Sequence, residues 1–366
     1  MLVDSSVRQV VAALPQPVKP TLSVTGVGAT FPYPVYTAWA GDYLVLTGEQ
    51  INYQGLGSGA GIKQMIAKSP TAIFGATDKP LKTELLDKHG LIQFPAVLGG
   101  VVPVVNLDGI APGELRLDGP TLAKIFLGEI KWWNDERIQK LNPHLKLSKI
   151  AIRPAPIHRS DGSGETFLFT DYLSKVSAEW KKDVGSGTFV QWPKDGMAGK
   201  GNNGVGIFVQ QIKGAIGYIG YPVARLAGMT YTSMINKRGE VVSPGPESFQ
   251  AALAGVDWSK FPDFDVSLTN TGNPGSWDIT AVTFILIPKK PADPAATTGA
   301  LRFFSYALTQ GMERALKLHY ASVPASVVPL VEVKWQQITG ADGKPLLFTP
   351  SLPVGRQPVF SEERRP

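Results

Sequence analysis

Short apolar runs alternate with helical patterns along most of this chain. The runs TAIFGATD at 71–78 and AVTFILIP at 281–288 have the length and composition of buried strands. Stretches such as 118–130 and 298–311 instead repeat their apolar residues at helical spacing. This alternation is typical of α/β proteins, in which helices cover the faces of a sheet. The 366 residues suffice for two domains or one large one.

Two extended apolar segments lie far apart in the chain, LGGVVPVVNL at 98–107 and WDITAVTFILIP at 277–288. If each carries the chain between two lobes, the first lobe is built from both ends of the chain. We therefore expect a two-strand hinge, which suits closure around a ligand. The predicted divisions are a flexible lead at 1–20, lobe I at 21–102 plus 281–347, lobe II at 103–280 and a C-terminal tail at 348–366.

Composition excludes several classes of function. The chain has no cysteine, which excludes disulfides, thiolate metal sites, cysteine nucleophiles and a lipid-modified N-terminal cysteine. The formal charge of +6 is spread along the chain, so it favours small anions in general and identifies no partner. No nucleic-acid motif accompanies it, and we expect no binding of nucleic acid. No apolar stretch reaches the roughly 18 residues that cross a bilayer, and no secretion signal is visible.

Three glycine-rich corners each precede a helical pattern: GVGATFPYPVYTAW at 26–39, YQGLGSGAGIKQMIA at 53–67 and HRSDGSGETFLFTDYL at 158–173. A helix start offers unpaired backbone N–H groups and a partial positive charge, and glycine lets a ligand approach them. One such corner is more often a plain turn with an N-cap. Three in one chain, one of them beside an arginine, favour a shared anion site.

Arg159 and Asp161 stand just before the third corner. A guanidinium presents a flat fork of donors that matches two oxygens of an oxoanion, and Asp161 could hold it in place. The alternative is a surface ion pair of little energetic value. Closeness to the glycine corner favours the functional interpretation.

Asp78 closes an apolar run, at the position where site residues of α/β sheets tend to lie. Phosphate near neutral pH still carries at least one proton, so an aspartate can accept a hydrogen bond from it, whereas sulfate has no such proton and would be repelled. Asp78 would thus discriminate between the two anions. The alternative is a turn-forming aspartate before Lys79 and Pro80.

Other motifs give weaker signals. GKGNNG at 199–204 matches the dinucleotide-binding pattern in form, but it follows a polar, proline-containing run rather than a strand, and we interpret it as a turn leading into a helix. The four histidines lack the spacing of metal ligands. A histidine base serving Ser163 stays open, because His158 is near it in sequence. A lone histidine beside an arginine is more often structural.

Several long motifs together resemble one family, the periplasmic phosphate-binding receptor of the bacterial high-affinity phosphate ABC transporter. The resemblance runs from about residue 21 to about residue 347 and rests on GVGATFPYPVYTAWA, YQGLGSGAGIKQMIA, FGATDKPL, FPAVLGGVVPVVN, LDGPTLAKIFLGEIKWWND, RSDGSGETF and AIGYIGY. It implies a type II periplasmic binding protein, an α/β fold of two lobes, each a mixed sheet flanked by helices. It also implies a periplasmic monomer that binds inorganic phosphate, delivers it to a membrane permease, and uses neither cofactor nor metal nor catalysis.

The resemblance further implies which residues contact phosphate or orient such a contact. They are Thr30, Phe31, Ser58, Asp78, Arg159, Asp161, Ser163, Gly164 and Glu165.

Glu165 departs from the family pattern, which commonly has threonine after DGSG. Its backbone N–H can still serve an anion, but a hydroxyl is lost and a carboxylate is gained. We expect the side chain to point away from the ligand, as a first-turn helix residue does. The alternative is a second acceptor in the pocket that favours more protonated phosphate.

Two other functions stay open from the sequence. One is a phosphate-ester hydrolase with Ser163 or Thr30 as nucleophile, although such esters need a metal or several cationic groups, and no metal-ligand cluster is visible. The other is a repurposed extracellular binding or adhesion protein that keeps the fold.

Overall fold

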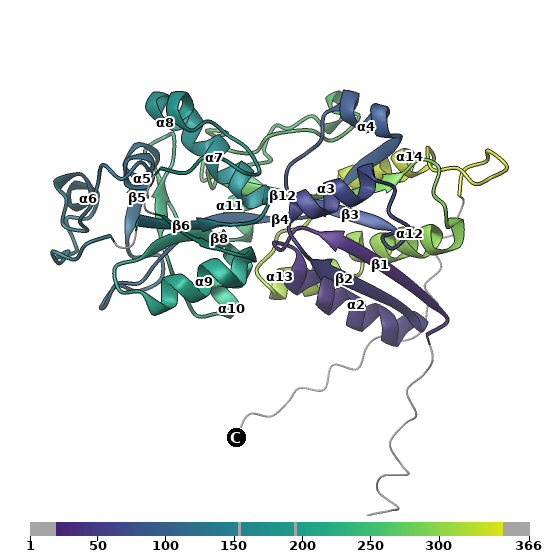
Figure 1. The fold of residues 1–366 in the computed structure, drawn as a ribbon, viewed down its shortest axis with the longest axis horizontal. Helices are drawn as coiled ribbons and strands as arrows, with labels where there is room; N and C mark the ends of the chain where they lie inside the picture. Colours follow the sequence, from purple (N-terminus) through teal and green to yellow (C-terminus); the bar gives the residue numbers. More distant parts are fainter. Residues whose placement is uncertain (1–19, 153–154, 194–195, 347–366) are drawn as a thin grey trace, which may run out of the picture.

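The computed structural model describes residues 20–152, 155–193 and 196–346. The predicted tail at 348–366, and all of the predicted lead except Pro20, lie outside the described residues. Strands and helices alternate as expected for an α/β protein, and Figure 1 shows them gathered around one long sheet. Within the described ranges, no helix combines the length and the apolarity needed to cross a membrane.

The strands are β1 (Leu22–Gly28), β2 (Glu49–Gly55), β3 (Phe74–Thr77), β4 (Leu91–Val105), β5 (Arg116–Asp118), β6 (Ala155–Arg159), β7 (Gly196–Gly199), β8 (Ile216–Gly220), β9 (Thr230–Tyr231), β10 (Ser233–Ile235), β11 (Val241–Val242) and β12 (Thr280–Pro288). The helices are α2 (Tyr33–Thr47), α3 (Ser58–Ile66), α4 (Thr83–His89), α5 (Gly119–Phe126), α6 (Glu136–Leu141), α7 (Gly164–Val176), α8 (Ala178–Asp183), α9 (Gly201–Gln211), α10 (Tyr221–Leu226), α11 (Pro246–Ala251), α12 (Pro294–Leu308), α13 (Met312–Lys317) and α14 (Val328–Trp335), with short 3-10 turns η1 (Trp258–Lys260) and η2 (Ala325–Val327).

The half of the sheet that we call lobe I has the order β2-β1-β3-β12. β1 runs parallel to β2 and β3, whereas β12 is antiparallel to β3. β12 is buried on both faces, so its consecutive side chains enter different hydrophobic clusters. Ile285 belongs to the main core, with Trp39 and Phe304. Leu286 belongs to a second cluster, with Met65. Helices α2 and α12 therefore cover one face, and α3 covers the other.

The other half, lobe II, continues the sheet with β8, β6 and β7, while β9 pairs with β4. Its core is aromatic: the ring of Phe169 on α7 stacks on Tyr218 of β8 with centroids 4.3 Å apart, and the ring of Phe126 on α5 lies 4.7 Å from that of Phe169. A separate three-stranded sheet, β11-β10-β5, also belongs to this half. These contacts fix α7 against β8, and α7 carries one of the glycine-rich corners.

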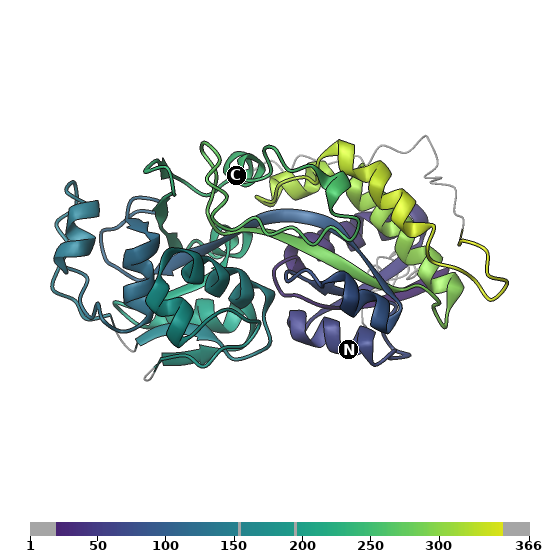
Figure 2. The same cartoon turned by 90° about the horizontal axis from the view of Figure 1, so that it is seen from above.

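β4 joins the two halves, and every one of its 15 residues is buried. Its residues up to Gly100 pair with β12, and its residues from Val101 onward pair with β8. β4 begins seven residues earlier than the predicted segment at 98–107, because a register shift against β12 beside Pro95 accommodates a residue without an N–H. Figure 2 shows β4 and β12 crossing together between the halves. The predicted lobe limits stay a proposal that this change of partners supports.

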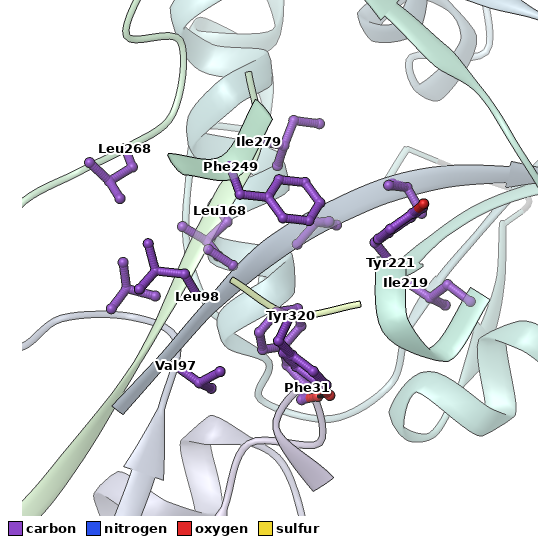
Figure 3. Close-up of a cluster of buried hydrophobic side chains, with 14 of the residues drawn as sticks. Phe31, Val97, Leu98, Leu168, Ile219, Tyr221, Phe249, Leu268, Ile279 and Tyr320 are labelled. Carbon is purple, nitrogen blue, oxygen red and sulfur yellow. Dashed lines mark hydrogen bonds between the residues drawn. The ribbon is translucent and has the colours of Figure 1, made fainter. Parts of the chain in front are cut away.

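Apolar side chains from both halves pack around this crossing (Figure 3). The indole N–H of Trp277 donates to the carbonyl of Val101 at 2.9 Å, at the residue where β4 changes partners. The ring of Phe249 is fully buried beside Tyr221. A Cβ on Gly100 would lie 2.7 Å from Cζ of Phe249 and 3.0 Å from Cδ1 of Trp277. This glycine lets the backbone pass close to two aromatic rings.

Gly100→Ala should therefore destabilise the protein by about 1–3 kcal/mol, the usual cost of adding a methyl group to a filled core. Gly41→Ala is the matched control, because Gly41 lies exposed within α2 and a Cβ there would meet nothing within 4 Å. That control should stabilise the protein by about 0.5–1 kcal/mol through helix propensity. Urea unfolding of both variants measures the two effects, and equal shifts would contradict the packing described for the crossing.

Candidate anion-binding site

The three glycine-rich corners meet at one place, each at the carboxyl end of a strand. Ser58 begins α3 after β2, Gly164 begins α7 after β6, and Thr30 lies between β1 and α2. The backbone N–H of Gly59 donates to the carbonyl of Gly162 at 2.8 Å, which joins lobe I to lobe II. A Cβ on Gly164 would lie 2.6 Å from Oγ of Ser58. The sheet thus brings together residues that are more than 100 positions apart.

Backbone conformation explains why glycine precedes α3. Gly57 has φ of +98°, a region that side chains disfavour. A Cβ at this position would also collide with Oδ2 of Asp161 in the other half. Glycine therefore lets the second corner approach the third.

Several backbone N–H groups at these corners have no hydrogen-bond acceptor within the described residues. They belong to the first residues of the helices or to the turn just before α2, where a helix cannot supply partners. Such groups together form a cradle suited to an anion. They are the N–H groups of Thr30, Phe31, Ser58, Gly164 and Glu165.

Arg159 supplies the positive charge of the site, and its side chain is only 1% exposed. Its Nε and Nη2 donate to the two carboxylate oxygens of Asp161 at 2.8 and 2.5 Å. Asp161 also accepts from the backbone N–H of Gly201 at 2.9 Å. Burial alone would lower the pKa of Arg159, but Asp161 and Glu165 raise it, so the guanidinium stays charged. The alternative of a surface ion pair is wrong, because the pair is buried and fixed.

Asp78 follows β3 and points into the same place. Its Oδ1 accepts from the hydroxyl of Thr283 at 2.6 Å, and its Oδ2 accepts from the hydroxyl of Ser58 at 3.3 Å. Burial, and next the charge of Glu165, raise its pKa to about 7. The alternative of a turn-forming aspartate is wrong, since Thr77 makes the local contacts with Lys79.

Glu165 contradicts the prediction that its side chain points away. The carboxylate is only 1% exposed and accepts a hydrogen bond from Nη1 of Arg159. The physical reason is its place on α7: the first turn of this helix faces the buried Arg159 rather than solvent, and the guanidinium attracts the carboxylate. Burial raises the pKa of Glu165, and Arg159 opposes part of that rise.

Comparison with known proteins adds independent evidence. Residues 15–310 match the model of the PBP superfamily domain. The phosphate-binding protein PstS of Xylella fastidiosa (strain Temecula1 / ATCC 700964) is 50% identical over 317 residues, which cover 86% of this chain and 85% of that protein. PstS of Haemophilus influenzae is 48% identical over 314 residues, covering 86% and 92%.

The chain belongs to the PstS family of the PBP superfamily. Among solved structures, the phosphate-binding protein from Stenotrophomonas maltophilia superimposes with a TM-score of 0.64 at 20% identity, over 85% of this chain and 93% of that one. This likeness confirms the two-lobed α/β fold.

Ser163, the nucleophile considered for a hydrolase, is used to cap α7. Its Oγ accepts from the backbone N–H of Thr166 at 3.2 Å. His158 does not serve as its base: the imidazole stacks on Trp192 with centroids 4.6 Å apart, and Nδ1 lies 3.1 Å from the carbonyl of Arg159. Among the described residues, no group of three or more histidine, aspartate or glutamate side chains could hold a metal ion.

Sequence reasoning missed Thr283 and Asn202. Thr283 lies on β12, 205 positions from the Asp78 that it contacts, and no motif surrounds it. Asn202 belongs to GKGNNG, which begins α9 rather than forming only a turn before it. Its Nδ2 donates to the hydroxyl of Thr30 at 3.1 Å, and its Oδ1 accepts from the N–H of Gly220 at 3.0 Å. Asn202 therefore links the first corner to lobe II.

An open cleft of about 880 Å³ lies next to the site. Thr30, Asp161 and Asn202 line it, whereas Ser58, Asp78, Arg159 and Glu165 do not. The anion cradle is thus closed off behind the cleft. Tyr33 and Leu56 of lobe I and Leu226 of lobe II form part of the cleft wall.

The unliganded protein should become less stable as the pH rises, because the buried Asp78 carboxyl group then loses its proton. Its pKa of about 7 in the folded protein exceeds the roughly 3.9 of an unfolded chain, so the folded state holds the proton more tightly. The free energy of unfolding therefore decreases as the pH rises from about 4 to about 7. Asp78→Asn should remove this loss and leave the variant more stable than the parent at pH 8, by about 2–4 kcal/mol.

Urea unfolding of phosphate-free protein at pH 5 and pH 8 measures this difference. Asp108→Asn, which changes an exposed carboxylate paired with Lys213, is the control and should keep the parent's pH dependence. An identical pH dependence for the parent and Asp78→Asn would contradict the raised pKa.

Proposed function

We propose that this protein binds one inorganic phosphate between its lobes and delivers it to the membrane permease of an ABC transporter. The observation that carries the proposal is the set of unpaired N–H groups from both lobes that surround Arg159 and the acceptor Asp78. An anion with a proton satisfies both parts, because it accepts from the cradle and donates to the carboxylate. The close PstS relatives are named as phosphate-binding proteins, which agrees with this ligand.

Selectivity in this proposal comes from hydrogen bonding rather than from net charge. Asp161 fixes the Arg159 fork before the ligand arrives, so little freedom is lost on binding. Asp78 accepts a hydrogen bond from the O–H group of a protonated phosphate, whereas sulfate brings no proton and meets a buried carboxylate. Thr283 and Ser58 keep the Asp78 carboxylate aimed at the cradle.

Closure of the lobes would signal that phosphate is bound. The site takes residues from both halves, and β4 and β12 connect those halves. A ligand that contacts both halves stabilises the closed form, because the open form offers only part of its partners. A permease that recognises both lobes at once would then distinguish loaded receptor from empty receptor. In this proposal the protein acts in the periplasm as a monomer and without catalysis.

Calorimetric titration of phosphate-stripped protein with phosphate, and then with sulfate, tests the proposal. The parent should bind phosphate 1:1 and should not bind sulfate. Asp78→Asn should reduce the preference for phosphate over sulfate by about tenfold or more, because the variant removes a buried acceptor worth about 1–3 kcal/mol to a protonated anion. An unchanged preference would exclude the role of Asp78. Folded protein that gives no heat with either anion would indicate a repurposed binding or adhesion protein.

A chromogenic phosphate ester tests the remaining alternative. We expect no turnover, since Ser163 caps α7 and His158 stacks on Trp192. Turnover that disappears in Ser163→Ala would instead establish a hydrolase. Ser174→Ala, on the same helix, is the control for an unrelated loss of a hydroxyl.

A further inference from the structure

Glu165 occupies the one guanidinium nitrogen of Arg159 that Asp161 leaves available. Asp161 accepts from Nε and Nη2 of Arg159, and Glu165 accepts from Nη1. Both the guanidinium and the Glu165 side chain are 1% exposed. A carboxylate of the protein itself therefore takes one of the three N–H groups of Arg159 that Asp161 leaves available, and it places a negative charge next to the guanidinium.

The second oxygen of this carboxylate is poorly satisfied. Within the described residues, Oε1 of Glu165 is buried without a hydrogen bond of good geometry, although the side chain of Asn202 lies near enough to lower the pKa of Glu165. A Cβ on Gly220 would lie 3.0 Å from Oε1, so this oxygen lies close to the Gly220 backbone. An unpaired buried carboxylate oxygen is costly and gives the side chain a reason to move or to take up a proton.

The charges around Glu165 oppose an additional anion. Arg159 on β6 is the cation near Glu165. The carboxylates of Asp161 before α7 and Asp78 after β3 carry negative charges that repel the Glu165 carboxylate. The phenols of Tyr218 on β8 and Tyr320 beyond α13 also lie within its electrostatic reach. With all carboxyl groups ionised, three negative charges would surround one positive charge before phosphate enters. Removing one of those charges is the simplest way to admit a phosphate.

We propose that the Glu165 carboxylate is an internal anion, which occupies Arg159 in the empty receptor and must take up a proton from solvent before phosphate can bind. The proposal rests on the proposed function and adds a condition to it. The neutral carboxyl group releases Nη1 of Arg159 to the ligand and can donate its own O–H to a phosphate oxygen. A neutral side chain such as threonine at this position would need no proton before phosphate binds.

Glutamate and a neutral side chain at this position should differ in the number of protons that the protein takes up with phosphate. Each phosphate bound above the pKa of Glu165 should carry one extra proton into the protein. The affinity for phosphate should therefore fall about tenfold more per pH unit in the parent than in a variant with a neutral side chain at this position. Titration of phosphate itself contributes equally to both proteins and cancels in the comparison. Titration of Asp78 does not cancel at every pH, because the charge of Glu165 helps to raise its pKa to about 7. At pH 8, above that value, Asp78 is mostly ionised in both unliganded proteins, so the comparison at this pH decides the test.

The test is calorimetric titration of the full phosphate-stripped chain with inorganic phosphate at pH 6, 7 and 8. Two buffers of different ionisation enthalpy at each pH give the number of protons taken up. The variants are Glu165→Gln, which keeps the shape and removes the charge, and Glu165→Thr, which replaces the carboxyl group with a smaller neutral hydroxyl group. Glu84→Gln is the matched control, since Glu84 is also a first-turn glutamate but is exposed on α4.

At pH 8 the parent and Glu84→Gln should take up about one proton more per phosphate than Glu165→Gln or Glu165→Thr. Tight binding by the Glu165 variants with weak binding by the parent at pH 8 would also support the internal anion. Equal proton uptake and equal affinity in all four proteins would overturn it, while leaving phosphate binding established. Folded proteins that all fail to bind phosphate at every pH would overturn the proposed function, and the internal anion with it. If Glu165→Gln does not fold, Glu165→Thr alone decides the comparison.

Discussion

The buried guanidinium of Arg159 is the group on which the rest of the site depends. An unpaired charge at this depth would be very costly, and two carboxylates offset that cost by occupying its nitrogens. Asp161 in turn is tied to the start of α9, and Glu165 belongs to the first turn of α7. The orientation of two helices and the end of β6 are thereby fixed relative to one positive charge.

An anion site with three carboxylates and one cation works through local donors rather than through net charge. The helix starts supply N–H groups that cannot be titrated, so the cradle keeps its donors at any pH. The carboxylates then decide which protonation state of a ligand is accepted. Backbone N–H groups thus bind the anion, and carboxylates select its protonation state, which explains how a receptor can prefer one oxoanion over another of similar size and charge.

The sequence predicts the parts of this structure that local patterns encode. The alternation of apolar runs and helical patterns predicts the α/β fold, and glycine beside serine predicts helix starts such as those at Ser58 and Ser163. Thr283 could not be predicted, because only the pairing of β12 with β3 brings it to Asp78. The direction of Glu165 also depends on tertiary structure: a first-turn glutamate normally faces solvent, and here the packing of α7 turns that position inward.

β4 has a consequence for how the molecule unfolds. Its first part completes the sheet of lobe I and its last part completes the sheet of lobe II, so neither core can be assembled without it. A loss of order in one lobe would leave the other with an incomplete sheet and an exposed apolar strand. The two lobes therefore form a single cooperative unit, and the flexibility needed for closure must come from bending of this shared strand rather than from melting of either half.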